Sequence, residues 1–492
     1  MSKRLIIVLA LVLLAGFTCA AYAEVQNVKV SGDITETGVI RNHLNLRDNP
    51  TVGFIGSGFG ENVNAILSQI RVRVDADLTD NVSTTVRVLN ERVWGTEKQN
   101  ANIQGTGTVA ANSTTSDSQI DIDLAYATLK EFLYSPLTLT IGRQELRYGN
   151  ALIIGDIDTN AVAAGHGRGD RVLPDSLDDL SLRKSFDAVK ATLNYDPLVV
   201  DLVGSKIFKN DVSQNNDTNL YGINAAYALR KSINLEGYWW ARSRKAAVTN
   251  STNAAVELNK RENLNVIGGR AVVTTIKDLT LSGELAYQFG DHERNATLYP
   301  DELVPALDDG ADTRRHVSAY AIQAAANYVL PVAKRYAPMV GASYTYLSGE
   351  KFQSTKRTYT GWDPMFEDQN SGTIFNKIFR ATNYQLFSGT VSMKPMDDLK
   401  LSLDAYYLML NQRYTQTAFA TPAHLSGLNG DPLYQMLGRK YLGWEWEAGL
   451  TYDYTEDVQF GLTGGMFIPG SAFSSENRDT AKQIMGSMKV SF

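Results

Sequence analysis

The chain has 492 residues, of which 43% are hydrophobic, 10% aromatic and 20% charged. This composition is too apolar for a disordered protein, so the chain folds. The formal net charge of −6 argues against a dedicated nucleic-acid binder. The single cysteine, Cys19, lies in a predicted leader. A disulfide framework, a cysteine nucleophile and a cysteine metal site are therefore excluded from the mature protein.

The first 23 residues predict a cleaved signal peptide. Lys3-Arg4 precedes an apolar run from Leu5 to Phe17, and Ala21-Tyr22-Ala23 places small residues where a signal peptidase cuts. The apolar run is shorter than the about 20 residues that a membrane anchor needs. We expect export, and we divide the chain into a signal peptide, residues 1–23, and one domain, residues 24–492.

After the leader, apolar and polar residues alternate with a period of two, as in strands with one buried face. Between Ala65 and Leu78 the even positions are mostly apolar, whereas the odd positions carry charged and amide side chains. Thr79-Asp80-Asn81 supplies a turn, and the alternation resumes at Val82. The segment predicts a β-hairpin with one apolar face and one ionic face.

The same unit recurs along the chain, with tight turns inside the hairpins and long polar segments between them. We expect tight turns at 79–81, 134–136, 196–197, 230–232, 276–278, 330–334, 395–398 and 455–457. We expect long loops at 42–64, 95–118, 148–184, 209–218, 245–260, 290–314, 349–382, 411–442 and 465–482. These connections join an even number of strands, about 18, with both termini on the short-turn side. This alternation of short turns and long loops is typical of outer-membrane barrels, in which the turns are periplasmic and the long loops are extracellular.

We therefore predict an all-β fold, a transmembrane antiparallel up-and-down β-barrel. Hydrocarbon offers no hydrogen-bond partner, so a spanning sheet must close. Aromatic rings are expected at both rims: Phe132, Tyr195, Tyr328 and Tyr454 beside short turns, and Trp94, Phe289 and Trp444 toward long loops. A secreted β-sandwich or solenoid would also alternate. It is disfavoured because no repeated motif occurs and because charges line one face of strand after strand.

In such a barrel the polar face surrounds an aqueous lumen, which is the candidate site. Strand alternation places these basic residues there: Arg71, Arg73, Arg87, Lys190, Arg242, Arg244 and Arg270. It places these acidic residues there: Asp75, Asp77, Glu91, Asp121, Asp123, Glu236, Glu284, Asp404, Glu445 and Glu447. Each charge either pairs across neighbouring strands and stiffens the wall, or acts on a solute.

Clusters of like charge are the stronger candidates for solute binding, because adjacent like charges repel unless counter-charges or a permeating ion compensate them. Arg71-x-Arg73 and Arg242-x-Arg244 are such clusters. With Arg143 and Arg147, they predict several weak binding points for an anionic solute. The glycine-rich loop at 149–184 either folds inward, which would place Arg168, Asp170 and Arg171 in the solute path, or stays outside.

Catalysis is not expected. The five histidines are scattered, and the mature chain contains neither H-E-x-x-H nor G-x-S-x-G. Loop carboxylates such as Asp178-Asp179 could bind Ca²⁺ through oxygen, but their spacing matches no defined calcium loop. We expect no cofactor.

The segment Gly142-Arg143-Gln144-Glu145-Leu146-Arg147-Tyr148-Gly149 resembles the Gly-Arg-Gln, then Tyr-Gly signature of the alginate-export family of outer-membrane barrels. Residues 185–189, 442–445 and 467–473 also agree with that family. The resemblance implies a monomeric, 18-stranded channel with an arginine-lined pore. Arg143 matches the arginine of the Gly-Arg-Gln motif, and Arg147 lies in the same segment. The acidic Asp121-x-Asp123 and Glu445-x-Glu447 distinguish this chain from a uniformly basic uronate conduit.

We expect a porin of the Gram-negative outer membrane that passively conducts hydrophilic, anionic solutes such as sugar acids or oligosaccharides. The expected partners are outer-membrane lipid and lipopolysaccharide, the barrel assembly machinery, and small anionic or polar solutes. Both termini are expected in the periplasm. Two alternatives stay open: a dedicated exporter of an alginate-like polysaccharide, and a non-transporting surface barrel that acts as an adhesin or receptor.

Overall fold

The computed structural model describes residues 27–47, 62–95, 120–157, 173, 177–208, 217–245, 248–249, 255–256, 261–293, 314–351, 356–414, 434 and 436–492. The predicted signal peptide lies outside the described residues, as do Arg168, Asp170 and Arg171.

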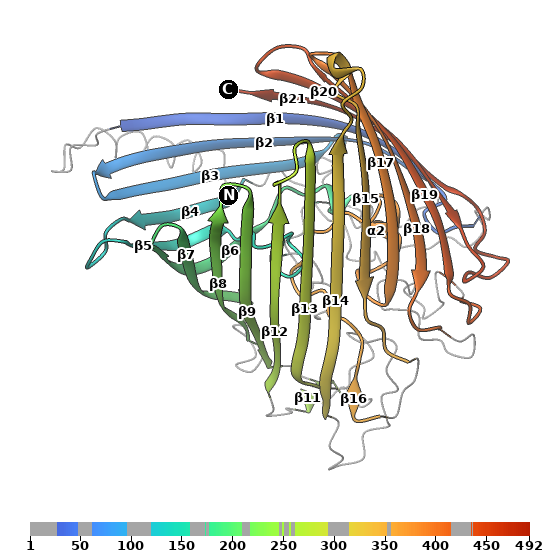
Figure 1. Cartoon of the computed structure of the whole chain (residues 1–492), viewed down its shortest axis with the longest axis horizontal. Coiled ribbons are helices and arrows are strands. Elements are labelled where there is room, and N and C mark those ends of the chain that lie inside the picture. Colours follow the sequence, from blue (N-terminus) through green and yellow to red (C-terminus); the bar gives the residue numbers. More distant parts are fainter. Residues whose placement is uncertain are drawn as a thin grey trace, which may run out of the picture.

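Eighteen long strands form one antiparallel sheet that closes on itself (Figure 1). They are β1 (Asn27–Asn42), β2 (Asn62–Thr79), β3 (Val82–Val93), β4 (Asp121–Leu129), β5 (Leu137–Glu145), β6 (Ser185–Asn194), β7 (Leu198–Phe208), β8 (Thr218–Arg230), β9 (Ile233–Lys245), β12 (Arg261–Val273), β13 (Leu279–Glu293), β14 (Arg314–Val329), β15 (Met339–Leu347), β17 (Tyr384–Met396), β18 (Leu399–Leu410), β19 (Tyr441–Asp453), β20 (Val458–Pro469) and β21 (Ala481–Ser491). The predicted strand number is confirmed.

The remaining elements are short. Strands β10 (Val248–Thr249) and β11 (Ala255–Val256) pair with each other, and β16 (Thr358–Tyr359) adds to β14. The helical turns are η1 (Asp178–Leu180), η2 (Lys334–Tyr336) and α2 (Phe375–Ile378). Within the described part of the chain, no helix combines the length and apolarity needed to span a membrane.

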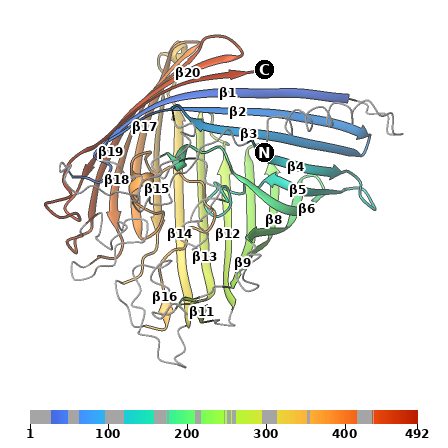
Figure 2. The same cartoon turned by 180° about the vertical axis from the view of Figure 1, so that it is seen from behind.

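Strands β1 and β21 close the barrel. Asp33 lies opposite Ser491, and the antiparallel register continues to Asn42 and Lys482. The Gly32 amide donates to the Phe492 carbonyl at 2.8 Å, and the Phe492 amide donates back at 3.0 Å. Both views show the two strands side by side (Figures 1 and 2). Closure provides the backbone partners that hydrocarbon cannot supply.

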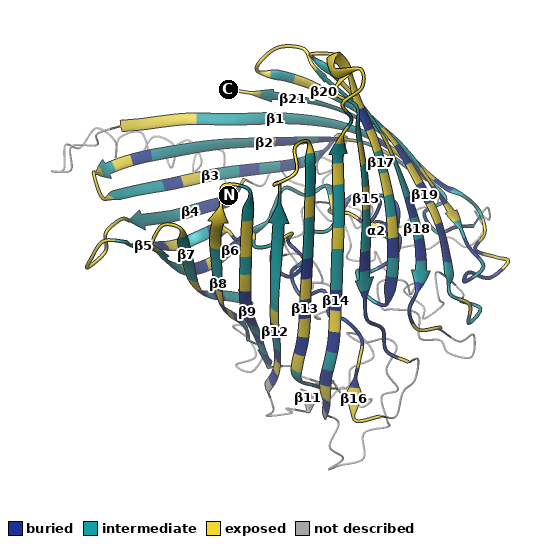
Figure 3. Cartoon of the chain, viewed as in Figure 1, coloured by how far each residue is buried: buried dark blue, intermediate teal, exposed yellow. Residues whose placement is uncertain are grey.

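The outward face of the sheet is apolar. Ile141, Val189, Leu202 and Ile223 are exposed there, and exposed and buried bands alternate along β13 and β14 (Figure 3). The expected rim aromatics other than Tyr328 are exposed: Phe132, Tyr195, Tyr454, Trp94, Phe289 and Trp444. The exposure of so many apolar side chains would be unfavourable in water, whereas it is favourable where the outward face contacts lipid.

The predicted alternation fails in β4. Strict period-two alternation along β4 would place Ile122, Leu124 and Tyr126 on one side of the sheet. The register with β3 shifts, so that Leu124 lies opposite Arg87 whereas Ile122 lies opposite Val88. Leu124 is buried. The prediction for Leu124 is wrong because a β-bulge inserts one residue and reverses the side that follows it.

Two segments fold into the barrel from the end where the strands join the long loops, which we call the long-loop end. The inner segment, residues 146–157, follows β5; the strap segment, residues 356–383, precedes β17. Their apolar side chains form one buried cluster with wall residues from β6 to β21. Helix α2 lies inside the ring of strands (Figure 1). The described part of the 149–184 loop therefore contributes residues 149–157 to the interior. It also contributes Leu173 and Leu177, which are buried in a second, smaller apolar cluster with Val39, Leu67 and Val93.

Candidate functional site

The Tyr-Gly part of the signature turns the chain into the lumen. Gly149 has a φ of +60°, a conformation that favours glycine. Its amide donates to Glu236 at 2.8 Å, and the Asn150 amide donates to Glu284 at 2.9 Å. A Cβ on Gly149 would lie 2.7 Å from a Glu284 carboxylate oxygen. The glycine therefore allows the backbone to approach the two carboxylates closely.

The other signature segments hold the strap segment against the wall. Phe186 packs edge-on against Phe366 of the strap, with ring centroids 6.0 Å apart. Phe467 packs on Phe375 of α2 at 5.9 Å. Both wall residues are fully buried. These family-typical residues therefore build the interior rather than contact a solute.

The prediction that Arg143 lines the pore is wrong. Arg143 pairs in register with Asp187 and shares the outward side of the sheet with Ile141 and Val189. Its guanidinium donates to the Asp187 carboxylate at 2.8 and 3.0 Å and to the Ile122 carbonyl. The buried Gln144 faces inward instead.

The Arg242-x-Arg244 cluster faces inward, as predicted, but it anchors the strap segment. Arg242 donates to Asp363 of the strap at 2.5 and 3.1 Å, and Arg244 donates to Glu262 at 2.6 Å. All four side chains are buried. Burial alone would raise the pKa of Asp363, but the charge and hydrogen bonds of Arg242 hold it well below its usual value. The repulsion between the two arginines is thus neutralised within the protein.

The acidic cluster Glu445-x-Glu447 has the same role on the opposite wall. The backbone amides of Ile374 and Phe375 donate to Glu445 at 2.8 and 2.7 Å. The Thr373 amide donates to Glu447 at 2.8 Å. These carboxylates bind the start of α2 and do not form an acidic lining.

Most of the other predicted lumen charges are paired near β2 to β5. Arg71 contacts Asp33 at 2.9 Å and Arg73 contacts Asp75 at 2.8 Å. Arg87 donates to Asp123 at 2.5 Å and also contacts Glu145. Here the wall-stiffening interpretation applies, because every one of these arginines has a carboxylate partner.

Arg270 and Lys190 differ from the other predicted basic residues. Arg270 has only a long contact of 3.9 Å with Glu284 and is 27% exposed, and it donates no hydrogen bond within the described residues. Lys190 lies opposite the inward Thr140 and Val203, and it has no ion pair with another described residue. Their donors are available to a solute.

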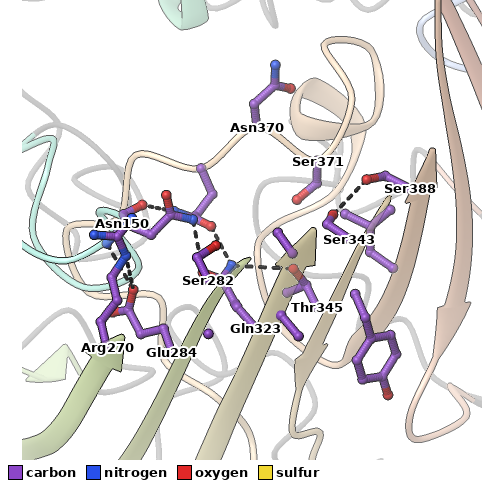
Figure 4. A pocket seen from close by; sticks show the side chains of 16 residues that line it. Asn150, Arg270, Ser282, Glu284, Gln323, Ser343, Thr345, Asn370, Ser371 and Ser388 are labelled. Atoms are coloured by element: carbon purple, nitrogen blue, oxygen red, sulfur yellow. Dashed lines mark hydrogen bonds and ion pairs between the residues drawn. The ribbon is translucent and has the colours of Figure 1, made fainter. Parts of the chain in front are cut away.

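Arg270 lines a pocket between the β12 to β17 wall and the two inward segments (Figure 4). The pocket encloses about 530 Å³, including the space open to solvent. Besides Arg270 and Glu284, its polar groups are uncharged amides and hydroxyls: Asn150, Ser282, Gln323, Ser343, Thr345, Gln369, Asn370, Ser371 and Ser388. Figure 4 places Asn370 and Ser371 on the strap above the wall residues.

Three amides join the segments at this pocket. Asn150 donates to Gln323 at 3.1 Å, and Gln323 donates to Gln369 at 2.6 Å. Gln369 in turn donates to the Asn150 carbonyl. The inner segment, the strap segment and β14 therefore meet around Arg270, so a solute there would touch all three.

Sequence reasoning missed several inward cations. Lys29, Lys400 and Lys489 are exposed and lie opposite inward residues near the short turns. Strand alternation was a sufficient signal for all three. Lys184 and Asp368 were also missed, because their partners lie far away in the sequence. Among the described residues, no group of three or more His, Cys, Asp or Glu side chains could hold a metal ion.

The sequence matches the family described as alginate export over residues 40–487. No curated protein matches the sequence as a relative. Several solved structures share the fold at 10% identity. OpdO of Pseudomonas aeruginosa and OccAB1 of Acinetobacter baumannii each give a TM-score of 0.54 over 96% of this chain and 98% of theirs. The outer membrane protein OpdK of Pseudomonas aeruginosa gives 0.51 over 95% of this chain and 100% of its own. The chain thus belongs to the alginate export family and is an outer-membrane β-barrel channel.

Proposed function

We propose that the channel passively conducts small hydrophilic anions and that carboxylated sugars are the solute class that fits its lumen best. The pocket around Arg270 carries this proposal. A guanidinium binds a carboxylate through charge-assisted hydrogen bonds. The surrounding amides and hydroxyls can exchange hydrogen bonds with sugar hydroxyls. Several weak contacts allow a solute to enter and leave.

The inward segments favour a small solute over a polymer. Two apolar clusters occupy the long-loop half of the lumen. A polysaccharide would need a continuous wide passage, whereas a monosaccharide acid needs only the space beside the strap segment. This supports the porin over the dedicated polysaccharide exporter.

In the orientation that we propose, the long loops are extracellular and both termini are periplasmic, as in bacterial barrels with short periplasmic turns. The barrel acts as a monomer, contacts lipopolysaccharide and is inserted by the barrel assembly machinery. It uses no cofactor, binds no calcium in its loops and catalyses no reaction.

Planar-bilayer recording of the purified barrel tests the proposal. In a potassium chloride gradient, the reversal potential should indicate preference for chloride. Arg270→Ala should lower the anion-to-cation permeability ratio about two- to fivefold, because one charge about 4 Å from an ion contributes about 1 kcal/mol in water. A barrel that inserts without conducting would contradict the channel. A cation preference would contradict only the anionic solute.

A non-transporting surface barrel is the second candidate, and the inward segments favour it. The strap segment is fixed by buried partners on opposite walls, Arg242 on β9 and Glu445 on β19. If this half of the lumen stays closed, the barrel would give no conducting steps. Radiolabelled glucuronate should then fail to enter vesicles that contain the protein, whereas the channel predicts uptake.

A further inference from the structure

Arg147 and Lys184 form a two-cation site whose ligand is a carboxylate of the protein itself. Arg147 follows β5 and Lys184 immediately precedes β6. Asp368 of the strap segment receives a hydrogen bond from Lys184 at 2.6 Å on one oxygen, and Arg147 donates to the other oxygen. Two positive charges therefore face one negative charge.

The site is open to solvent, unlike the anchor around Arg242. The Arg147 side chain is 57% exposed, Lys184 is 35% exposed and Asp368 is 24% exposed. Arg147 uses only one of its several N–H donors within the described residues. Exposed ion pairs are weak, because water and salt screen the attraction between the two charges. An anion that reaches this site can therefore compete with Asp368.

The backbone fixes where the resident carboxylate lies. The Asp368 amide donates to the Ala151 carbonyl at 2.9 Å, and Gly155 approaches the Asp368 Cβ so closely that a Cβ on Gly155 would lie 2.6 Å from it. Asp368 therefore stays near the two cations even when its carboxylate releases them. Burial opposes ionisation, but Lys184 and then Arg147 hold the pKa of Asp368 below its usual value. The resident group is a carboxylate at neutral pH.

The two-cation site adjoins the pocket. Gln369, the residue after Asp368, contacts Asn150 and Gln323 in the amide group beside Arg270. Asn150 lies three residues after Arg147 in the inner segment. The two-cation site and the pocket around Arg270 are therefore linked through consecutive strap residues, Asp368 and Gln369.

We propose that Asp368 is a resident competitor that occupies an anion site made by Arg147 and Lys184, and that the carboxylate of a passing solute displaces it. The inference rests on the proposed anion channel and identifies a second binding point of that channel. Competition by Asp368 keeps the affinity low, which allows the solute to leave.

Current block by potassium gluconate in planar bilayers tests the inference. Asp368→Asn should strengthen the block about tenfold, because a site that is free in only about one-tenth of the molecules binds about tenfold more weakly than a free site. The matched control is Asp404→Asn. Asp404 also faces the lumen, but it receives its hydrogen bond from Thr390 and forms no ion pair with a cation in the described part of the chain. The control should stay within about twofold of the wild type.

As a single substitution, Arg147→Ala should weaken the block by gluconate. Combined with Asp368→Asn, it should abolish the tenfold stronger block that Asp368→Asn alone produces. The single substitution leaves the strap residue unchanged, so it tests the site even if Asp368→Asn fails to fold. Equal block in Asp368→Asn and Asp404→Asn would overturn the inference, and so would an unchanged block in Arg147→Ala. If the wild-type barrel still prefers anions in either case, the proposed function stands. A wild-type barrel without anion preference would overturn both.

Discussion

The two halves of the lumen use the same residue types in different ways. In the long-loop half, arginines and glutamates such as Arg242 and Glu445 are buried and hold the strap segment. Toward the short turns, Arg270, Lys190 and Lys400 face the lumen without a hydrogen-bonded carboxylate among the described residues. A charge on the polar face of a barrel strand is therefore not by itself a solute contact.

Burial decides which role a charge takes. A buried charge needs a partner and satisfied hydrogen bonds, because desolvation is unfavourable by several kcal/mol. An exposed charge remains hydrated, so it can exchange water for a solute. Substitutions of the buried residues that hold the strap segment, such as Arg242 and Glu445, should therefore lower stability strongly and affect solute binding little. Substitutions of the exposed lumen cations, such as Arg270, should affect ion selectivity and lower stability only slightly.

The largest expected effect comes from Arg242→Met. The substitution leaves Asp363 buried without its main counter-charge, and breaking a buried pair in this way is unfavourable by about 3–5 kcal/mol. The thermal unfolding midpoint in detergent, followed by circular dichroism, should fall clearly. The control Arg270→Met should reduce the free energy of unfolding by less than about 1 kcal/mol. Equal losses in the two variants would contradict the comparison.

Glu445→Ala should have the next largest effect. It removes the acceptor of two strap amides, Ile374 and Phe375, and each unsatisfied buried donor is unfavourable by about 1–3 kcal/mol. We expect a less stable barrel with a larger and noisier single-channel conductance, because the strap segment is released. Glu445→Gln keeps an oxygen acceptor and should retain most of the wild-type behaviour. A quiet wild-type current in Glu445→Ala would argue against the anchor.

A further effect on stability is expected from pH. Burial raises the pKa of Glu367 to about 8, and the negative charges of Asp156 and Asp368 raise it as well. The hydrogen bond from the Gln369 amide and the charge of Arg380 lower this pKa, but by less. The folded state therefore keeps a proton that the unfolded chain loses above its ordinary pKa of 4.5. Stability should fall as the pH rises from about 4.5 to about 8.

Unfolding midpoints between pH 5 and 9 measure this contribution. Glu367→Gln carries no titratable group, so its midpoint should depend less on pH across this range. The same pH dependence in wild type and Glu367→Gln would assign the effect to another group.

The smallest expected effect is that of Arg143→Ala. Arg143 faces outward beside Asp187, so the anion-to-cation permeability ratio should equal that of the wild type. Arg270→Ala, measured in the same gradient, is the positive control. A reduced ratio in Arg143→Ala would mean that this side of the sheet reaches the conduit.

Much of the barrel could be predicted from the sequence because hydrocarbon imposes one simple rule on every strand. Side chains at alternate positions must be apolar, and the backbone must pair with a neighbour. The loops expected at 209–218 and 411–442 coincide with the gaps between β7 and β8 and between β18 and β19. The rule fails at the bulge near Leu124, where one extra residue changes which side chains face the lumen. The sequence did not predict this bulge, because one extra residue does not alter the local composition.

The site was harder to predict because its contacts join distant parts of the chain. Asp363 lies 121 positions from Arg242, and no local pattern connects them. For Arg143, by contrast, the local sequence pattern was sufficient to predict the orientation of the side chain. Alternation with Leu139 and Ile141 already indicates an outward side chain, and the family signature alone suggested the pore. The physical pattern was the better guide to its orientation.

The central claim is that an aqueous path passes the Arg270 pocket, and cysteine modification in Ser388→Cys tests it most directly. The only native cysteine, Cys19, lies in the predicted leader. Ser388 lines the pocket, whereas Val391 on the same strand is exposed on the outward face. An anionic thiosulfonate reagent should reduce the Ser388→Cys current in one step, faster than a cationic reagent, and should leave the Val391→Cys current unchanged. Complete modification of Ser388→Cys, verified by mass spectrometry, with no change in current would contradict the claim.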